Sequence, residues 1–163
     1  DPYEAVFDII RLSNGSAQAC FFMMCEDDLR RIISHPRAMI CTDSGVAAGS
    51  KCYHPRLRAS FPRMLARYVR EQGIVTLPEM IRKMTSMPAH VYGLSRKGLI
   101  KEGMDADLCI FDAGQISDTA DFIRCTAPNE GLRYVIIAGT IAAENGVSTG
   151  VLAARIEKRL HRR

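Results

Sequence analysis

The feature that most constrains the fold is the alternation of short apolar runs with helical patterns in the first part of the chain. Residues 17–24 (AQACFFMM) and 38–41 (AMIC) form apolar runs of the kind that a strand covered on both faces of a sheet shows. One-sided apolar patterns over 1–12 and 26–36 precede these runs. The order helix, strand, helix, strand predicts an α/β architecture with buried parallel strands.

Helical signals continue beyond the second run. Apolar residues recur at helical spacing from Phe61 to Val69, and Gly73 terminates this pattern. Residues 76–79 (TLPE) match a capping box with proline in the first turn, which predicts another helix, and Pro88 begins a further short one. The α/β pattern therefore extends to about residue 94.

The pattern changes beyond residue 94. Glycines punctuate short apolar runs such as 108–111 (LCIF) and 134–137 (YVII), which is typical of short strands joined by turns. We therefore predict two units: an α/β unit over 1–94, and β-strands followed by a basic tail over 95–163.

Size, charge and cysteine content exclude several classes of protein. The chain has 163 residues, too few for a complete enzyme barrel, and no apolar run approaches the roughly 18 residues of a membrane span. The net charge of +4 comes entirely from residues 155–163, where no aromatic residue interrupts the charges, so we expect no nucleic-acid or membrane partner. The six cysteines lie mostly in apolar runs, which favours reduced thiols and a cytoplasmic location.

Several longer phrases of the sequence are characteristic of one enzyme family. They are RAMICTDSG (37–45), HPR (54–56), SFPRMLARYVRE (60–71), MTSMPA (84–89) and KEGMDADLCIFD (101–112). Together they resemble the N-acyl-D-amino-acid deacylase (D-aminoacylase) family of the amidohydrolase superfamily, and the phrase 60–71 is the family-specific part. The chain departs from that pattern at Ala59, where glycine is usual, and at Ala138-Gly139, where Asn-Gly is usual.

The resemblance implies a fold and an activity. The family has a (β/α)8 barrel and a small β-sandwich, so residues 1–94 would be the last β/α units of the barrel and 95–163 the C-terminal sandwich strands. The implied reaction is zinc-dependent hydrolysis of a small-molecule N-acyl-D-amino acid to a carboxylate and a D-amino acid. The His-x-His pair that begins the family's metal site is absent from this sequence. We therefore expect the chain to be part of a longer protein, and by itself to be inactive, to bind no zinc and to be prone to association as a homo-oligomer.

Asp43 is the candidate catalytic residue. It follows the run 38–41, and barrel enzymes place their chemistry at the carboxyl ends of strands. The resemblance implies that this carboxylate exchanges a proton with a metal-bound water and itself touches the metal. From the residues alone, an Asx-turn between a strand and a loop is the alternative. The phrases that flank Asp43 favour the catalytic interpretation.

Two further candidates, His54 and Arg56, follow in the next loop. One interpretation is that this loop contacts substrate and that Arg56 faces a carboxylate; the other is a solvent-facing loop beside the site. Cys41, Cys52 and His54 also carry zinc-ligand atoms, as Asp43 does, but their spacing matches no zinc-knuckle or zinc-ribbon pattern.

Two other functions stay open at this point. The aspartate and the sandwich strand are features of the whole superfamily, so a ring-opening enzyme of the dihydroorotase or hydantoinase kind is one alternative. A non-catalytic structural or interaction module that keeps this part of the fold without its metal is the other.

Overall fold

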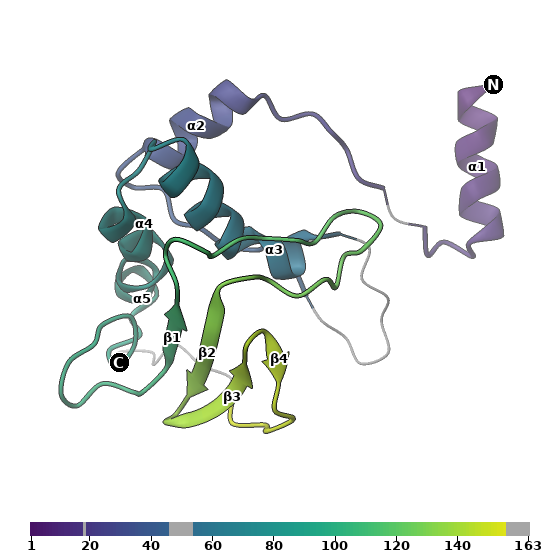
Figure 1. Ribbon diagram of the computed structural model, residues 1–163. Helices are drawn as coiled ribbons and strands as arrows, with labels where there is room; N and C mark the ends of the chain where they lie inside the picture. Colours follow the sequence, from purple (N-terminus) through teal and green to yellow (C-terminus); the bar gives the residue numbers. More distant parts are fainter. Residues whose placement is uncertain (18, 46–53, 156–163) are drawn as a thin grey trace, which may run out of the picture.

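Helices occupy the first half of the chain and strands the second, as Figure 1 shows for the computed structural model. The structure describes residues 1–17, 19–45 and 54–155. In chain order the elements are α1 (Pro2–Leu12), α2 (Glu26–Ser34), α3 (Arg56–Arg63), η1 (Met64–Glu71), α4 (Leu77–Met84), α5 (Ser86–Tyr92), β1 (Leu108–Phe111), β2 (Leu132–Ile137), β3 (Thr140–Glu144) and β4 (Val147–Ser148).

The strands form one antiparallel sheet in the order β1-β2-β3-β4. The predicted runs 108–111 and 134–137 are confirmed as β1 and as most of β2. Ala138 and Gly139 turn the chain from β2 into β3 with φ angles of 49° and 79°, the left-handed conformation that a two-residue hairpin turn requires. Asp107 accepts the Ala138 N–H at 2.7 Å. The Lys97 ammonium and then this N–H hold the pKa of Asp107 below its ordinary value.

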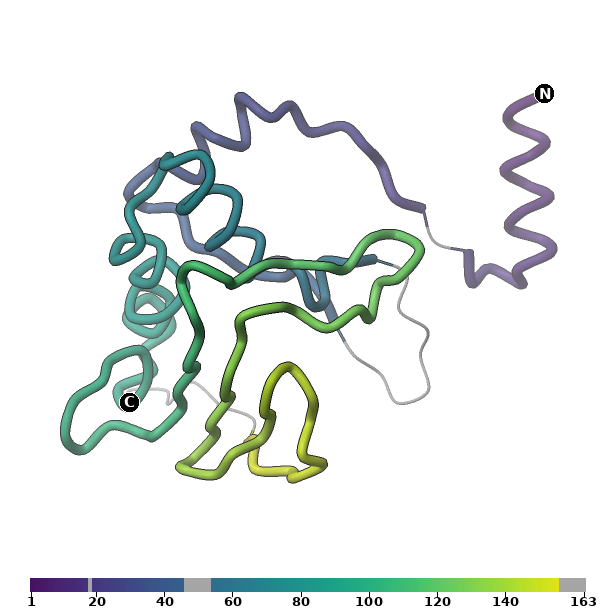
Figure 2. Tube along the Cα trace, in the orientation of Figure 1, coloured from purple at the N-terminus to yellow at the C-terminus, as the bar shows by residue number. Residues whose placement is uncertain are grey.

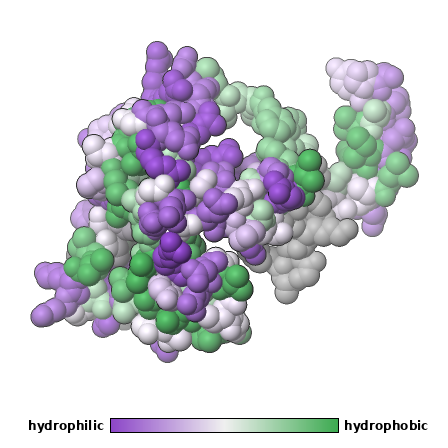
Figure 3. Space-filling view, viewed as in Figure 1, coloured by the Kyte–Doolittle hydropathy of each residue, from purple (hydrophilic) through white to green (hydrophobic). Residues whose placement is uncertain are grey.

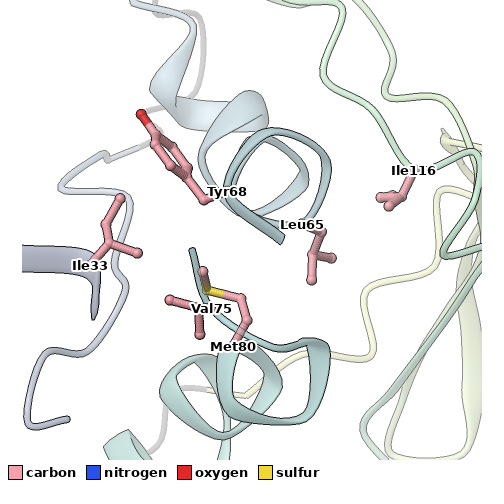
Figure 4. Close-up of a cluster of buried hydrophobic side chains, with 6 residues drawn as sticks. All are labelled: Ile33, Leu65, Tyr68, Val75, Met80 and Ile116. Carbon is pink, nitrogen blue, oxygen red and sulfur yellow. The ribbon is translucent and has the colours of Figure 1, made fainter. Parts of the chain in front are cut away.

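The hydrophobic core lies between the helices and the connection that joins β1 to β2 (Figure 4). The helical patterns that begin at residues 26, 61 and 76 are confirmed by α2, by α3 with η1, and by α4. Each of them directs its apolar positions into one cluster, whose buried members are Ile33, Leu65, Tyr68, Val75, Met80 and Ile116.

Helices α3 and η1 form one continuous helix with a proline inside it. Met64, at their junction, keeps helical angles of φ −60° and ψ −43°. Pro62 has no N–H to donate to the carbonyl of Arg58, so one helical hydrogen bond is lost and the following turns widen into the π-helical η1. Asn129 Nδ2 donates to that carbonyl instead, at 3.0 Å. Gly73, at φ 60°, ends the helix as predicted.

Lys83 of α4 holds the segment that follows α2. Its side chain is completely buried, and Nζ donates to the carbonyls of His35 and of Ala38, the latter at 3.2 Å. The carbonyl of Lys83 accepts the N–H of Ile40 at 3.3 Å. A single residue thus fixes the backbone that leads towards Asp43.

The start of α4 corrects one local prediction. The helix begins after Thr76, but the side chain of Thr76 makes no capping hydrogen bond, so the predicted capping box is wrong. Glu79 instead accepts two hydrogen bonds from Arg82, at 2.7 and 2.8 Å, which lower the pKa of its carboxyl. A paired guanidinium binds a carboxylate more strongly than a backbone N–H does.

The two predicted barrel strands are wrong for this chain. The described residues of 17–24 and all of 38–41 lie outside any strand, and 84% of Phe22 is exposed. A strand needs a neighbour on at least one side, and in the described ranges the strands pair only within the β1–β4 sheet. The fold is therefore mixed α and β with a small antiparallel sheet.

Helix α1 and the segment after it extend away from the core (Figure 2). None of the residues of α1 is buried, and Figure 3 shows hydrophobic surface on this helix and along the extended segment. Large apolar side chains such as Phe7, Leu12 and Met23 are more than half exposed. Among the described residues, none of the helices has the length and apolar character needed to cross a membrane.

Candidate functional site

Asp43 lies in an exposed irregular segment and contacts Arg56 at the start of α3. Its φ angle is 47°, a left-handed conformation that is uncommon for residues other than glycine and that aspartate tolerates better than most. Of its side chain, 84% is exposed. Its Oδ2 lies 3.0 Å from Nη1 of Arg56, so the structure brings two of the predicted site residues into contact.

His54 is joined to the same site through Arg56. Its Nδ1 accepts the backbone N–H of Arg56 at 3.1 Å, which places the proton of the neutral ring on Nε2. Burial, and then the positive charge of Arg56, lower the pKa of His54 below its ordinary value. All three predicted residues, Asp43, His54 and Arg56, therefore meet at the first turn of α3.

Phe122 is a member of this site that the sequence did not indicate. Its ring packs edge-on against the His54 ring with centroids 5.0 Å apart, and against Phe22 with centroids 5.1 Å apart. Phe122 lies in an irregular segment without periodicity, so no pattern distinguishes it. The only available signal is the length of the connection 112–131, because long irregular connections in compact proteins usually serve a function.

The pair formed by Asp43 and Arg56 is able to exchange partners. Both side chains are substantially exposed, 84% and 43% respectively, and exposed ion pairs contribute about 0–1 kcal/mol. A carboxylate of another molecule can therefore replace Asp43 at the guanidinium at little cost. The arrangement combines a carboxylate able to take up a proton with a guanidinium able to bind an acid group.

The described residues do not form a metal site by themselves. Within the ranges that the structure describes, three or more His, Cys, Asp or Glu side chains nowhere come together as a metal-binding group. Cys41, Asp43 and His54 therefore do not form the alternative zinc cluster, and Cys52 lies outside the described residues. Zinc sites take three or four protein ligands, so a zinc site that included Asp43 would need its other ligands from outside the described residues.

Comparison with known proteins identifies relatives over most of the chain. The model of the amidohydrolase family matches residues 11–143. An N-acyl-D-glutamate deacylase of Alcaligenes xylosoxydans xylosoxydans is 38% identical over 123 residues, which are 76% of this chain and 25% of that protein. A D-aminoacylase of the same organism is 36% identical over 140 residues, 86% of this chain and 28% of that protein.

Solved structures give the same result. A D-aminoacylase with a binuclear metal center superposes with a TM-score of 0.76 at 34% identity, over 82% of this chain and 28% of that one. The N-acyl-D-glutamate deacylase of Bordetella bronchiseptica, complexed with zinc and a phosphonate inhibitor, superposes with a TM-score of 0.68 at 34% identity, over 80% of this chain and 28% of that one.

These matches cover different shares of the proteins compared. The chain spans about a quarter of the length of the curated deacylases that it matches. A dihydroorotase of Lactobacillus johnsonii is 36% identical over 53 residues only, which are 32% of this chain. The similarity to deacylases is thus the more extensive of the two.

Proposed function

The chain belongs to the amidohydrolase family, and from that premise we propose that it is the C-terminal part of a zinc-dependent deacylase of N-acyl-D-amino acids. One observation carries the proposal: the fold places the Asp43 carboxylate 3.0 Å from the Arg56 guanidinium. Such a pair suits an enzyme in which the carboxylate moves a proton while the guanidinium binds an acid group of the substrate. The deacylases among the relatives support this choice of substrate.

The reaction adds water to the amide carbonyl and breaks the carbon–nitrogen bond. A bound zinc ion would polarise that carbonyl and lower the pKa of a water molecule. Asp43 takes up the proton released as water attacks, and returns it to the departing amine. Arg56 binds the substrate's own carboxylate, and His54 holds the Arg56 backbone through Nδ1.

The same proposal assigns the two parts of the chain. Residues 1–94 would complete the barrel of the whole enzyme, and 95–163 would add strands to its sandwich. The small antiparallel sheet and the exposed apolar side chains of 21–24 support this division, since such side chains are expected where another part of a protein packs. The complete enzyme would be cytoplasmic and would act on small molecules.

The test is a deacylation assay on the complete polypeptide that contains this segment. We expect release of D-glutamate or D-aspartate from their N-acetyl derivatives, with the L-enantiomers at least about a hundredfold slower, a ratio that a chiral site reaches with about 2.7 kcal/mol. Residues 1–163 alone, the matched control, should be inactive. Ring opening of dihydroorotate without deacylation would support the dihydroorotase or hydantoinase class. Absence of both activities would support the non-catalytic module.

A further inference from the structure

The connection 112–131 between β1 and β2 is longer than its role in the sheet requires. The next two turns of the sheet, at Ala138-Gly139 and Asn145-Gly146, need only two residues each. Antiparallel neighbours are usually joined by two to five residues, and longer irregular connections are commonly functional. In Figure 1 this connection leaves the sheet and runs across α3 before it returns.

Buried side chains and polar contacts hold the connection against the helices. Ile116 is buried in the core beside Leu65 (Figure 4). Arg63 Nη2 lies 2.8 Å from Asp118 Oδ2, and Arg70 Nη1 donates to the Ile116 carbonyl at 2.6 Å. The connection is therefore attached along α3 and η1, not merely placed near them.

Two residues of the connection contact the two ends of the short segment 54–58. Asn129 donates to the carbonyl of Arg58, to which Pro62 has no N–H to donate. Phe122 packs against His54, whose Nδ1 accepts the Arg56 N–H. Arg56 lies between these two contacts, and its guanidinium faces Asp43.

We infer that the connection 112–131 is a positioning strap for Arg56, with Phe122 and Asn129 as its positioning residues. Contacts on both sides of Arg56 order its backbone in advance, so that part of the conformational freedom is not lost when the guanidinium binds a carboxylate. The small sheet thereby contributes to a site to which it lends no reacting group. The role of Arg56 towards substrate rests on the proposed function; the placement of its backbone does not.

The first arm of the test uses NMR on the full 163-residue chain. Asn129→Leu removes the hydrogen bond to Arg58 and leaves unchanged the Phe122 ring, which packs against His54. We expect it to shift the His54 ring resonances towards those of free histidine and to speed amide exchange at Arg56 at least threefold. Ile123→Ala is the matched control, since Ile123 adjoins Phe122 and is 94% exposed, and it should change neither.

Two results of this arm overturn the inference. In the first, the β2–β3 hairpin resonances show that the Asn129→Leu chain is folded, but the His54 ring resonances and the amide exchange at Arg56 are unchanged. If Asn129→Leu does not fold, Asp118→Leu removes the acceptor through which the strap contacts Arg63 and must produce the same two changes. A folded Asp118→Leu chain without them overturns the inference equally.

The second arm measures kinetics in the complete enzyme. Phe122→Leu and Asn129→Leu should raise KM for an N-acyl-D-amino acid at least fivefold and leave kcat within twofold, because binding of the carboxylate is what a displaced Arg56 loses. A residue that only stabilised the fold would lower kcat through a smaller active fraction and leave KM unchanged. If the unaltered enzyme deacylates nothing, the proposed function fails while the NMR arm still decides the strap.

Discussion

Replacement of Lys83 by methionine tests how this segment is held together. Lys83 Nζ is completely buried, donates to the carbonyls of His35 and Ala38, and lies 3.9 Å from Glu79 Oε1. Methionine keeps the volume of the apolar stem and has a similar helix propensity, so the change mainly removes the ammonium. Two effects of opposite sign then compete.

The loss of the hydrogen-bond donor to the two carbonyls should outweigh the desolvation cost that is recovered when the buried charge is removed. Removing a buried charge recovers its desolvation cost, which makes some replacements of whole ion pairs neutral or stabilising. Here the acceptors stay behind, and each partly buried carbonyl without a donor costs about 1–3 kcal/mol. We therefore expect Lys83→Met to lower the free energy of unfolding by about 2–4 kcal/mol.

Urea unfolding followed by far-UV circular dichroism measures this change, at one fixed protein concentration because association alters apparent stability. Lys101→Met is the matched control: Lys101 is exposed, and surface replacements usually change stability by less than about 0.5 kcal/mol. A Lys83→Met chain that unfolds at the same urea concentration as Lys101→Met would show that the buried ammonium does not stabilise the fold.

Three further predictions concern the hairpin, the histidine and the metal. Ala138→Asn should raise the free energy of unfolding by about 0.5–1 kcal/mol, because asparagine tolerates the φ of 49° better than alanine; an unchanged or lower urea midpoint contradicts this. In an NMR titration the pKa of His54 should lie below 6.5, and Arg56→Gln should raise it towards that value; a midpoint at or above 6.5 in the unaltered chain contradicts this. The pKa of His54 is lower in the folded chain than the 6.5 of the unfolded chain. The stability that neutral His54 contributes is therefore complete above pH 6.5 and is lost as the pH falls from 6.5 through the folded pKa. In calorimetry the chain alone should bind zinc no more tightly than its urea-denatured form, because its described residues gather no ligand group; one sub-micromolar zinc per chain contradicts this.

Local signals in the sequence predicted the elements that depend on local interactions. Acidic residues at 26–28 begin α2, Gly73 ends η1, and the runs at 108–111 and 134–137 form strands. A helix satisfies its own backbone, and a hairpin brings its own partner, so nearby residues suffice to specify both.

Local signals did not suffice for the apolar runs at 17–24 and 38–41, which do not form the predicted strands. Their composition indicates a need for burial but does not say which element provides it. In this chain the second run attaches to α4 through the N–H of Ile40, and the first remains exposed. Strand formation depends on neighbours far along the chain, which a single run does not encode.

The candidate site was predictable to a similar degree. The phrases around Asp43, His54 and Arg56 indicated them as candidates, with a solvent-facing loop as the alternative for the last two. The structure pairs Arg56 with Asp43 and joins the Arg56 N–H to His54, and the roles of all three stay predictions. Phe122 could not be found in the same way, because its place beside His54 depends on the path of an irregular connection.

The kcat of Asp43→Asn in the complete enzyme decides whether Asp43 moves the proton in amide hydrolysis. Asparagine has nearly the same shape but cannot take up the proton, so kcat should fall at least about a hundredfold, with the zinc content and the circular dichroism spectrum unchanged. A variant that keeps more than about a third of the original kcat would show that Asp43 is only a turn residue, since loss of an acid–base group costs at least about a hundredfold.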